Sequence, residues 1–250
     1  TKVSEIAKGA FSHNRKLDSI SLPNVTVVGD YGFASNTYLV SVKLGKLTYI
    51  GEYGFFETAI TEMPTFTAET YIGKYAFSHT FLTSVNIPNG ATVAEGTYSE
   101  CQKLETIVIG DDVEIGKYAF SLNKDLAFKV VDGEDNGKKV FKYEFTSPIT
   151  SLTIGKNANI GENAFSNAAK LESVTLGEGA ILGKMAFYNN SSLKEIDLSK
   201  VESMIALPFH PSNAWTIHEF LENAEEILAQ VEADAQARFP KAKVSLMNKI

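Results

Sequence analysis

Apolar residues return at a fixed interval along most of the chain, with polar residues between them. The clearest copy is Ile72-Gly73-Lys74-Tyr75-Ala76-Phe77, followed by Leu82-Thr83-Ser84-Val85-Asn86-Ile87-Pro88. The same aromatic position falls at Phe11, Phe33, Phe55, Phe77, Tyr98, Phe120, Phe165 and Phe187. The spacing is 21 or 22 residues, apart from 45 residues between Phe120 and Phe165, which we count as two repeats. A fixed period in this range predicts a solenoid.

The second half of each repeat has the pattern Leu-x-x-Ile-x-Ile, in which the last apolar residues alternate with polar ones. This alternation is typical of a strand with one buried face. Identical strands stacked about 4.8 Å apart bury each other's side chains and pair their backbones. The sequence therefore predicts a repeat solenoid, mainly β with short turns, that has a parallel sheet on one face.

The first half of each repeat supplies the opposite wall of the core. In the clearest copy, Ile72 and the ring of Phe77 fill the interior from that side. Position 73 and position 76 hold small residues in nearly every repeat. Small residues at two fixed places indicate that the backbone of the next coil passes close to them.

Two stretches depart from the repeat. Pro64 cannot donate to a strand ladder and predicts an irregularity or bulge in the third repeat. The atypical segment 127–146 has two alternating stretches around the polar turn 132–137, a pattern typical of a β-hairpin. We expect this hairpin either to replace half a repeat or to project from the side of the coil.

The repeat pattern fades after Val201. Residues 216–219, Thr-Ile-His-Glu, match a capping box, and apolar residues then follow helical spacing as far as Val231. An open solenoid needs a polar-faced cap over its last coil, which this helix would supply. We therefore predict a solenoid of about nine 22-residue repeats over residues 1–214 and a helical cap over residues 215–250. A partner-binding amphipathic helix is the alternative.

The motif Ile-Gly-x-x-Ala-Phe, followed by Leu-x-x-Ile-x-Ile-Pro, resembles the BspA-like leucine-rich repeats of bacterial surface proteins, over roughly residues 3–200. That family often has Cys or Asn three residues before the Leu. Here these positions hold Asn14, Asn36, His79, Cys101, Asn123, Ala168 and Asn190. The resemblance implies a curved solenoid, an extracellular or cell-surface location, and adhesion to host matrix proteins or to other cells.

Composition narrows the possible partners. The formal net charge of −7 argues against a nucleic-acid partner, because phosphate binding needs a basic stripe. No apolar run reaches the length of a membrane span. The chain begins at Thr1 without a signal-peptide pattern, as a trimmed piece of an exported protein would. The single cysteine allows no internal disulfide.

Candidate chemistry is sparse. The four histidines are scattered, and no His-Glu-x-x-His or paired-cysteine spacing is present for zinc. Cys101 and His79 occupy the Asn/Cys position of the repeat, which favours a structural role for both. Residues 132–137 have a calcium-loop character, but Tyr143 stands where an EF-hand needs Glu, and a hairpin turn is the better interpretation. We expect no catalytic residues, no metal, no cofactor and no enzyme activity.

The outward positions of the predicted sheet remain as a binding surface. They carry no aromatic or arginine anchors, the residues that usually dominate protein hot spots. They form either a hydrated sheet face or a flat polar platform for an extended peptide, a matrix protein or a glycan. The sequence thus favours a surface-displayed adhesin, with a ligand-free structural spacer as the alternative. The candidate ligand-facing residues are Ser41, Lys43, Ser84, Asn86, Thr106, Ser151, Thr153, Ser173 and Thr175.

Overall fold

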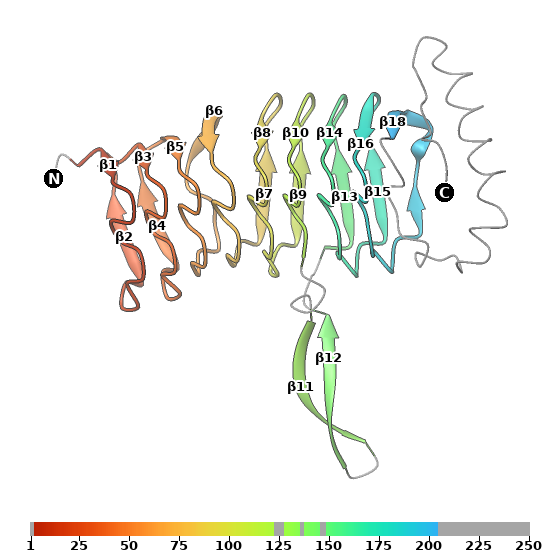
Figure 1. The fold of residues 1–250 in the computed structure, drawn as a ribbon, viewed down its shortest axis with the longest axis horizontal. Coiled ribbons are helices and arrows are strands. Elements are labelled where there is room, and N and C mark those ends of the chain that lie inside the picture. Colours follow the sequence, from red (N-terminus) through yellow and green to blue (C-terminus); the bar gives the residue numbers. More distant parts are fainter. Residues whose placement is uncertain (1–2, 123–127, 136–137, 146–148, 205–250) are drawn as a thin grey trace.

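The structure is a solenoid whose coils lie side by side along one axis (Figure 1). It is a computed structural model that describes residues 3–122, 128–135, 138–145 and 149–204. Each coil passes through two walls of short strands and one side made of turns. Strands of neighbouring coils pair in parallel. The predicted repeat solenoid with a parallel sheet on one face is confirmed.

The first wall is built from the alternating half of each repeat. Its side chains alternate strictly, so that Val85 and Ile87 are buried and Ser84 and Asn86 are exposed. It consists of a two-stranded sheet, β2–β4, and a five-stranded sheet, β7–β9–β13–β15–β17. The strands are β2 (Ser19–Leu22), β4 (Ser41–Leu44), β7 (Ser84–Ile87), β9 (Thr106–Ile109), β13 (Ser151–Ile154), β15 (Ser173–Leu176) and β17 (Glu195–Ile196).

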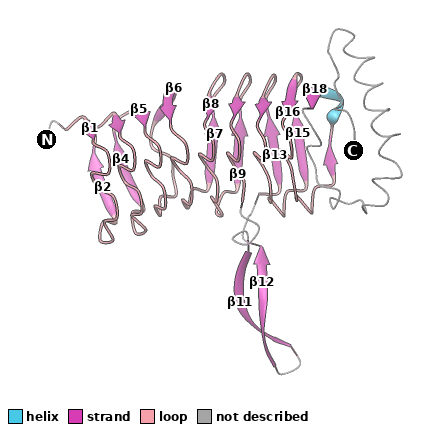
Figure 2. Cartoon of the chain, viewed as in Figure 1, coloured by secondary structure: helices cyan, strands magenta, loops and turns pink. Residues whose placement is uncertain are grey.

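The second wall lies across the core from the first and is also a parallel sheet (Figure 2), which the sequence pattern did not predict. Most of its strands have only two to four residues, too few to show alternation. The strands are β1 (Glu5–Ile6), β3 (Val27–Val28), β5 (Leu47–Ile50), β6 (Phe66–Ile72), β8 (Thr92–Val93), β10 (Glu114–Ile115), β14 (Asn159–Ile160), β16 (Ala180–Leu182) and β18 (Val201–Met204). A 3-10 turn, η1 (Leu198–Lys200), leads into β18.

The core is organised around the repeated aromatic position. The rings stack face to face along the solenoid axis with centroids 5.1 to 5.7 Å apart. On the turn side, the backbone of each coil is bonded to the next, as where Phe55 N–H donates to the Ala76 carbonyl at 2.8 Å. The column of rings and the backbone ladder therefore run the length of the stack together.

The small residues of the first half-repeat stand where coils approach each other. A Cβ at Gly29 would lie 2.9 Å from the Lys8 backbone nitrogen, and one at Gly73 would lie 2.6 Å from that of Glu52. Real Cβ atoms essentially never come so close to another heavy atom. The predicted close approach of neighbouring backbones is confirmed.

The interval between Phe120 and Phe165 contains one coil, so our count of two repeats was wrong. The two rings stack directly at 5.1 Å, and β9 and β10 pair with β13 and β14 of the very next coil. The additional residues include β11 (Phe128–Asp135) and β12 (Lys138–Phe145), an antiparallel hairpin that forms a sheet of its own. It points away from the stack (Figure 1), so of our two interpretations the projecting hairpin is confirmed.

The Asn/Cys position of the repeat holds side chains that bond the buried turns. The Asn36 amide donates to the carbonyl oxygens of Phe11 and Phe33 at 2.7 and 2.8 Å, and accepts from the Asn14 backbone N–H at 2.7 Å. Cys101 is buried and lies 3.2 Å from the Phe77 carbonyl. Burial raises the pKa of the Cys101 thiol to about 11, so the thiol stays protonated, as its predicted structural role requires.

His79 does not occupy that position, contrary to our prediction. Thr80 does, and its hydroxyl donates to the Phe77 carbonyl at 2.8 Å. This coil has one residue fewer between the aromatic residue and the following leucine than the coil of Phe33 and Leu39, so counting back from Leu82 misses the position by one. His79 instead stands at a left-handed turn position, with φ of 58°.

The predicted C-terminal helix lies in residues 205–250, outside the described residues. The division into a solenoid over 1–214 and a cap over 215–250 therefore stays a prediction.

Candidate functional site

The predicted ligand-facing residues lie on the outer face of the first wall, in two rows that follow the strand register. In the first row Ser84 lies opposite Thr106, and Ser151 lies opposite Ser173. In the second row Thr153 lies opposite both Val108 and Thr175. Most of these side chains are exposed, and Ser173 is half-buried. The first wall thus presents a continuous, largely polar face across β7, β9, β13 and β15.

Ser41 and Lys43 are not part of that continuous face. They lie on β4, which pairs with β2 in a separate sheet. Seven of the nine predicted residues are therefore brought together, and two stand apart from them.

The two parts of the first wall are separated by residues 61–72, which we call the seam. Residues 61–65 form no strand, and they include Pro64, whose predicted irregularity is confirmed. In the second wall, β6 pairs with β5 but is not joined to β8. The register of the β5–β6 pair also shifts, because Leu47 and Tyr49 lie opposite Phe66 and Tyr71. The seam thus interrupts both walls.

Thr70 holds the resulting bulge in place. Its hydroxyl donates to the Leu47 carbonyl at 2.8 Å and accepts from the Thr67 backbone N–H at 2.9 Å. A side chain therefore replaces backbone partners where the register shifts.

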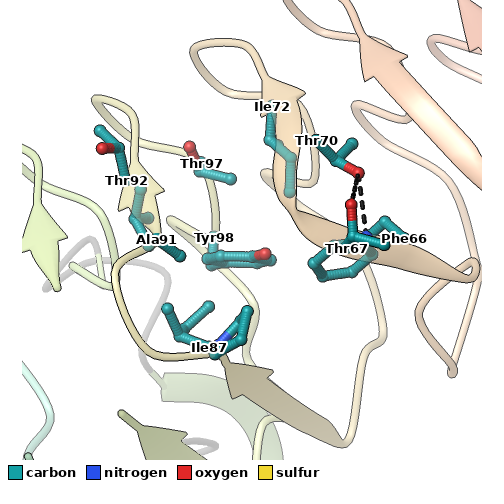
Figure 3. A pocket seen from close by; sticks show the side chains of 11 residues that line it. Phe66, Thr67, Thr70, Ile72, Ile87, Ala91, Thr92, Thr97 and Tyr98 are labelled. Carbon is teal, nitrogen blue, oxygen red and sulfur yellow. Dashed lines mark hydrogen bonds between the residues drawn. The ribbon is translucent and has the colours of Figure 1, made fainter. Parts of the chain in front are cut away.

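A small cavity lies behind the bulge (Figure 3). It is lined by Phe66, Thr70, Ile87 and Tyr98, among others, and the volume open to the centre of a water molecule is about 10 Å³. This is near the smallest volume that holds one water. The cavity is therefore too small for an organic ligand.

The hydroxyl of Tyr98 points into this cavity. Tyr98 is 1% exposed, and its hydroxyl has no hydrogen-bond partner among the described residues. Burial raises the pKa of this phenol well above its usual range, so it stays protonated. Phenylalanine fills the same position in the other coils. The cavity is consequently a packing feature of the seam.

A column of stacked tyrosines, exposed at Tyr31 and half-buried at Tyr53 and Tyr75, runs along the turn side of the first coils. Tyr31, Tyr53 and Tyr75 stand two residues before successive core phenylalanines, and their ring centroids are 5.0 and 5.2 Å apart. All three have left-handed backbones, with φ of 55 to 57°. We call these residues the outer column. The Tyr75 ring lies over Gly96 of the next coil, where the column ends.

A second pair of tyrosines lies on the outer face of the second wall. Tyr49 on β5 and Tyr71 on β6 stack at 5.0 Å and are 38% and 50% exposed. With the outer column they form what we call the tyrosine surface. Our sequence reasoning missed it, because it considered outward positions on the first wall only. The available signal was the recurrence of Tyr at the same 22-residue interval as Phe.

A row of charged residues runs between the two sets of tyrosines, one residue per coil. Three ion pairs stabilise it: Lys8 with Asp30 at 3.5 Å, Lys74 with Glu95 at 3.0 Å, and Lys117 with Glu162 at 2.9 Å. The hydrogen bond from Lys74 holds the pKa of Glu95 below its usual range. Glu52, between Asp30 and Lys74 in this row, forms no ion pair with any described residue.

In the part of the chain that the structure describes, no group of three or more His, Cys, Asp or Glu side chains could hold a metal ion. Over the same residues, the structure contains no helix with the length and apolar character of a membrane span.

Comparison with known proteins agrees with the geometry. A family model described as the BspA type leucine-rich repeat region matches six copies, over residues 4–127 and 134–230. The crystal structure of a leucine-rich repeat protein from Bacteroides ovatus is similar to 86% of this chain, with a TM-score of 0.54 and 18% identity. The match covers 63% of that longer protein, and at this identity it shows the fold alone. No curated protein matches the chain.

Proposed function

The chain belongs to the BspA-type leucine-rich repeat family, and on that premise we propose that it is a non-enzymatic binding module displayed at the cell surface. Its role would be that of an adhesin for host matrix proteins, glycans or other cells. The observation that carries this proposal is the continuous polar face of the first wall, where small hydroxyl and amide side chains stand in register over four strands.

A face of this kind supports binding through many weak contacts. None of its side chains is large enough to anchor a ligand alone, and each hydrogen bond contributes only about 0.5 to 1.5 kcal/mol net. Useful affinity would come from several coils acting together, or from many copies of the protein on one surface. An extended protein segment or a glycan chain that runs along the stack would meet these rows in sequence.

The test is a binding screen of the purified chain against immobilised matrix proteins and a glycan array. A variant with Ser84→Lys, Thr106→Lys and Ser151→Lys should lose binding to the ligands found, while its melting temperature stays unchanged. A control variant has three lysines on the second wall instead, at Thr92, Glu114 and Asn159, and should bind normally. Failure of the wild-type chain to bind anything would favour the structural spacer without a ligand.

A further inference from the structure

We propose that the tyrosine surface, with Glu52 at its centre, is a docking site for a basic segment of a protein partner. An arginine or lysine of that segment would pair with the Glu52 carboxylate, between the tyrosine hydroxyls. This inference rests on the proposed binding function and names its partner class. It places the contact on the coils around the seam, from Tyr31 to Tyr75, away from the polar face of the first wall.

The backbone of the outer column is the first argument. Its left-handed conformation suits Gly and Asn, and the equivalent positions in the other coils hold Gly9, Gly96, Tyr118, Asn163 and Met185. A tyrosine there adopts a conformation that its side chain disfavours. The fold itself does not require it, since the same turn forms with Gly or Asn. Left-handed residues other than glycine recur along the whole solenoid, and what sets the outer column apart is that three successive coils place tyrosine there.

The stacking geometry limits the occupant. Tyr53 stacks on both Tyr31 and Tyr75, so both of its ring faces are covered. At the centre of the column a partner therefore meets ring edges rather than a free aromatic face. Stacking of a sugar ring needs such a face, whereas protein partners use tyrosine as a rigid anchor with a polar end. The surface consequently fits a protein segment better than a glycan.

Charge is the third argument. Asp30 and Lys74 each have an ion-pair partner, and Glu52 between them has none among the described residues. The negative charge of Glu52 acts on a tyrosine of each set. Burial raises the pKa of Tyr49 and of Tyr53 most, and the negative charge of Glu52 raises each further. A carboxylate that forms no ion pair with a described residue and lies close enough to act on two tyrosines is complementary to a guanidinium or ammonium group.

The test uses a fluorescent synthetic peptide with four arginines separated by Gly-Ser spacers, and a twin with neutral citrulline in place of arginine. The wild-type chain should bind the arginine peptide at least about tenfold more tightly than the citrulline twin. Glu52→Gln should weaken arginine-peptide binding about tenfold. Glu62→Gln, at an exposed position on the first-wall side, makes the same change in net charge and should have no effect.

A second variant separates binding from stability. Tyr31→Asn with Tyr53→Asn installs a residue that another coil already uses at this position, so the melting temperature should stay within about 4 °C of wild type. Binding of the arginine peptide should nevertheless be lost. Equal loss in the Glu62→Gln control would overturn the proposal, because it would indicate attraction to the net charge alone. Equal binding of the citrulline twin would overturn it as well.

Failure of this inference can be told apart from failure of the proposed function. If the matrix or glycan ligands found in the screen bind normally to the Tyr31→Asn and Tyr53→Asn variant, and the arginine peptide does not bind wild type, the binding module stands and the tyrosine surface is not its site. A glycan whose binding is lost in that variant would replace the basic protein segment as the occupant.

Discussion

The coils before the seam and the coils after it share one backbone plan but differ in their surfaces. Before the seam, the turn position two residues ahead of the core ring holds Gly9, Tyr31 and Tyr53, and the first wall has only β2 and β4. After it, the same position holds Tyr75, Gly96, Tyr118, Asn163 and Met185, and the first wall is a continuous five-stranded sheet. The repeat therefore determines the fold, and the positions that it leaves free determine what each part of the solenoid can bind.

The two parts are joined through the aromatic column. Phe77 stacks on Phe55 at 5.2 Å and on Tyr98 at 5.7 Å, the widest spacing among the ring stacks of the core. The wide step falls where β6 and β8 are not joined. Around this ring the two parts are joined by the turn-side backbone hydrogen bonds and by only one wall at each boundary, β5–β6 and then β7–β9.

The largest effect is expected for Phe77→Ala. Truncating this fully buried ring should cost about 3 to 5 kcal/mol in free energy of unfolding and should separate the two parts into distinct transitions. Urea unfolding followed by circular dichroism would measure both. Lys74→Ala, an exposed change in the same coil, is the control and should leave the unfolding midpoint close to that of wild type. Similar midpoints for the two variants would contradict the role of the column.

For Tyr98→Phe we expect a higher free energy of unfolding instead of a lower one. This substitution restores the residue of the other coils and removes a buried hydroxyl without a partner, which should stabilise the chain by about 1 to 3 kcal/mol. Thermal melts against wild type would show it as a higher melting temperature. A lower one would mean that the cavity contains a water bonded to this hydroxyl.

A smaller effect is expected from removing the hairpin. Residues 123–148 can be replaced by Asn-Ser-Ser, the turn that precedes Leu193, because the coils on either side of the hairpin are already paired directly. The free energy of unfolding should change by less than about 1 kcal/mol, since loop-closure entropy depends weakly on length. Loss of cooperative unfolding would show that the segment packs into the core.

The smallest effect is expected for Lys74→Gln. In the wild-type chain, the hydrogen bond from Lys74 lowers the pKa of Glu95 in the folded state. The Lys74–Glu95 pair therefore stabilises the fold above the usual carboxyl pKa, and this contribution is lost as the pH falls. The variant should show a higher pKa for Glu95, measured from the carboxyl carbon shift by NMR. An unchanged pKa would mean that the Tyr75 hydroxyl, which also donates to Glu95, is sufficient.

Strict periodicity made the first wall and the core predictable from the sequence. Alternation in Ser84–Ile87 identified the first wall and its outward residues, and the ring spacing identified the core. Periodicity could not reveal the second wall, because a strand as short as Glu5–Ile6 contains no alternation. It also misjudged the Phe120–Phe165 interval, because the insertion is nearly as long as one repeat.

The candidate sites were predictable to different degrees. The polar rows of the first wall result from one strand pattern repeated in register. The tyrosine surface combines residues from a turn, a strand and a charged row, and only the stacking of coils brings Tyr31, Tyr53 and Tyr75 into one column. The Tyr98 hydroxyl likewise lacks a partner among the described residues because of a bulge in another coil. No local sequence pattern indicates that bulge.

The seam has a mechanical consequence. Hydrogen bonds between stacked coils point along the solenoid axis, so a pull on the two ends loads them in tension, one boundary after another. Most boundaries are bonded on both walls and on the turn side. Around residues 61–72 one wall or the other is not joined, first between β4 and β7 and then between β6 and β8. Under force, the solenoid would lengthen there first, with the coils on either side still folded.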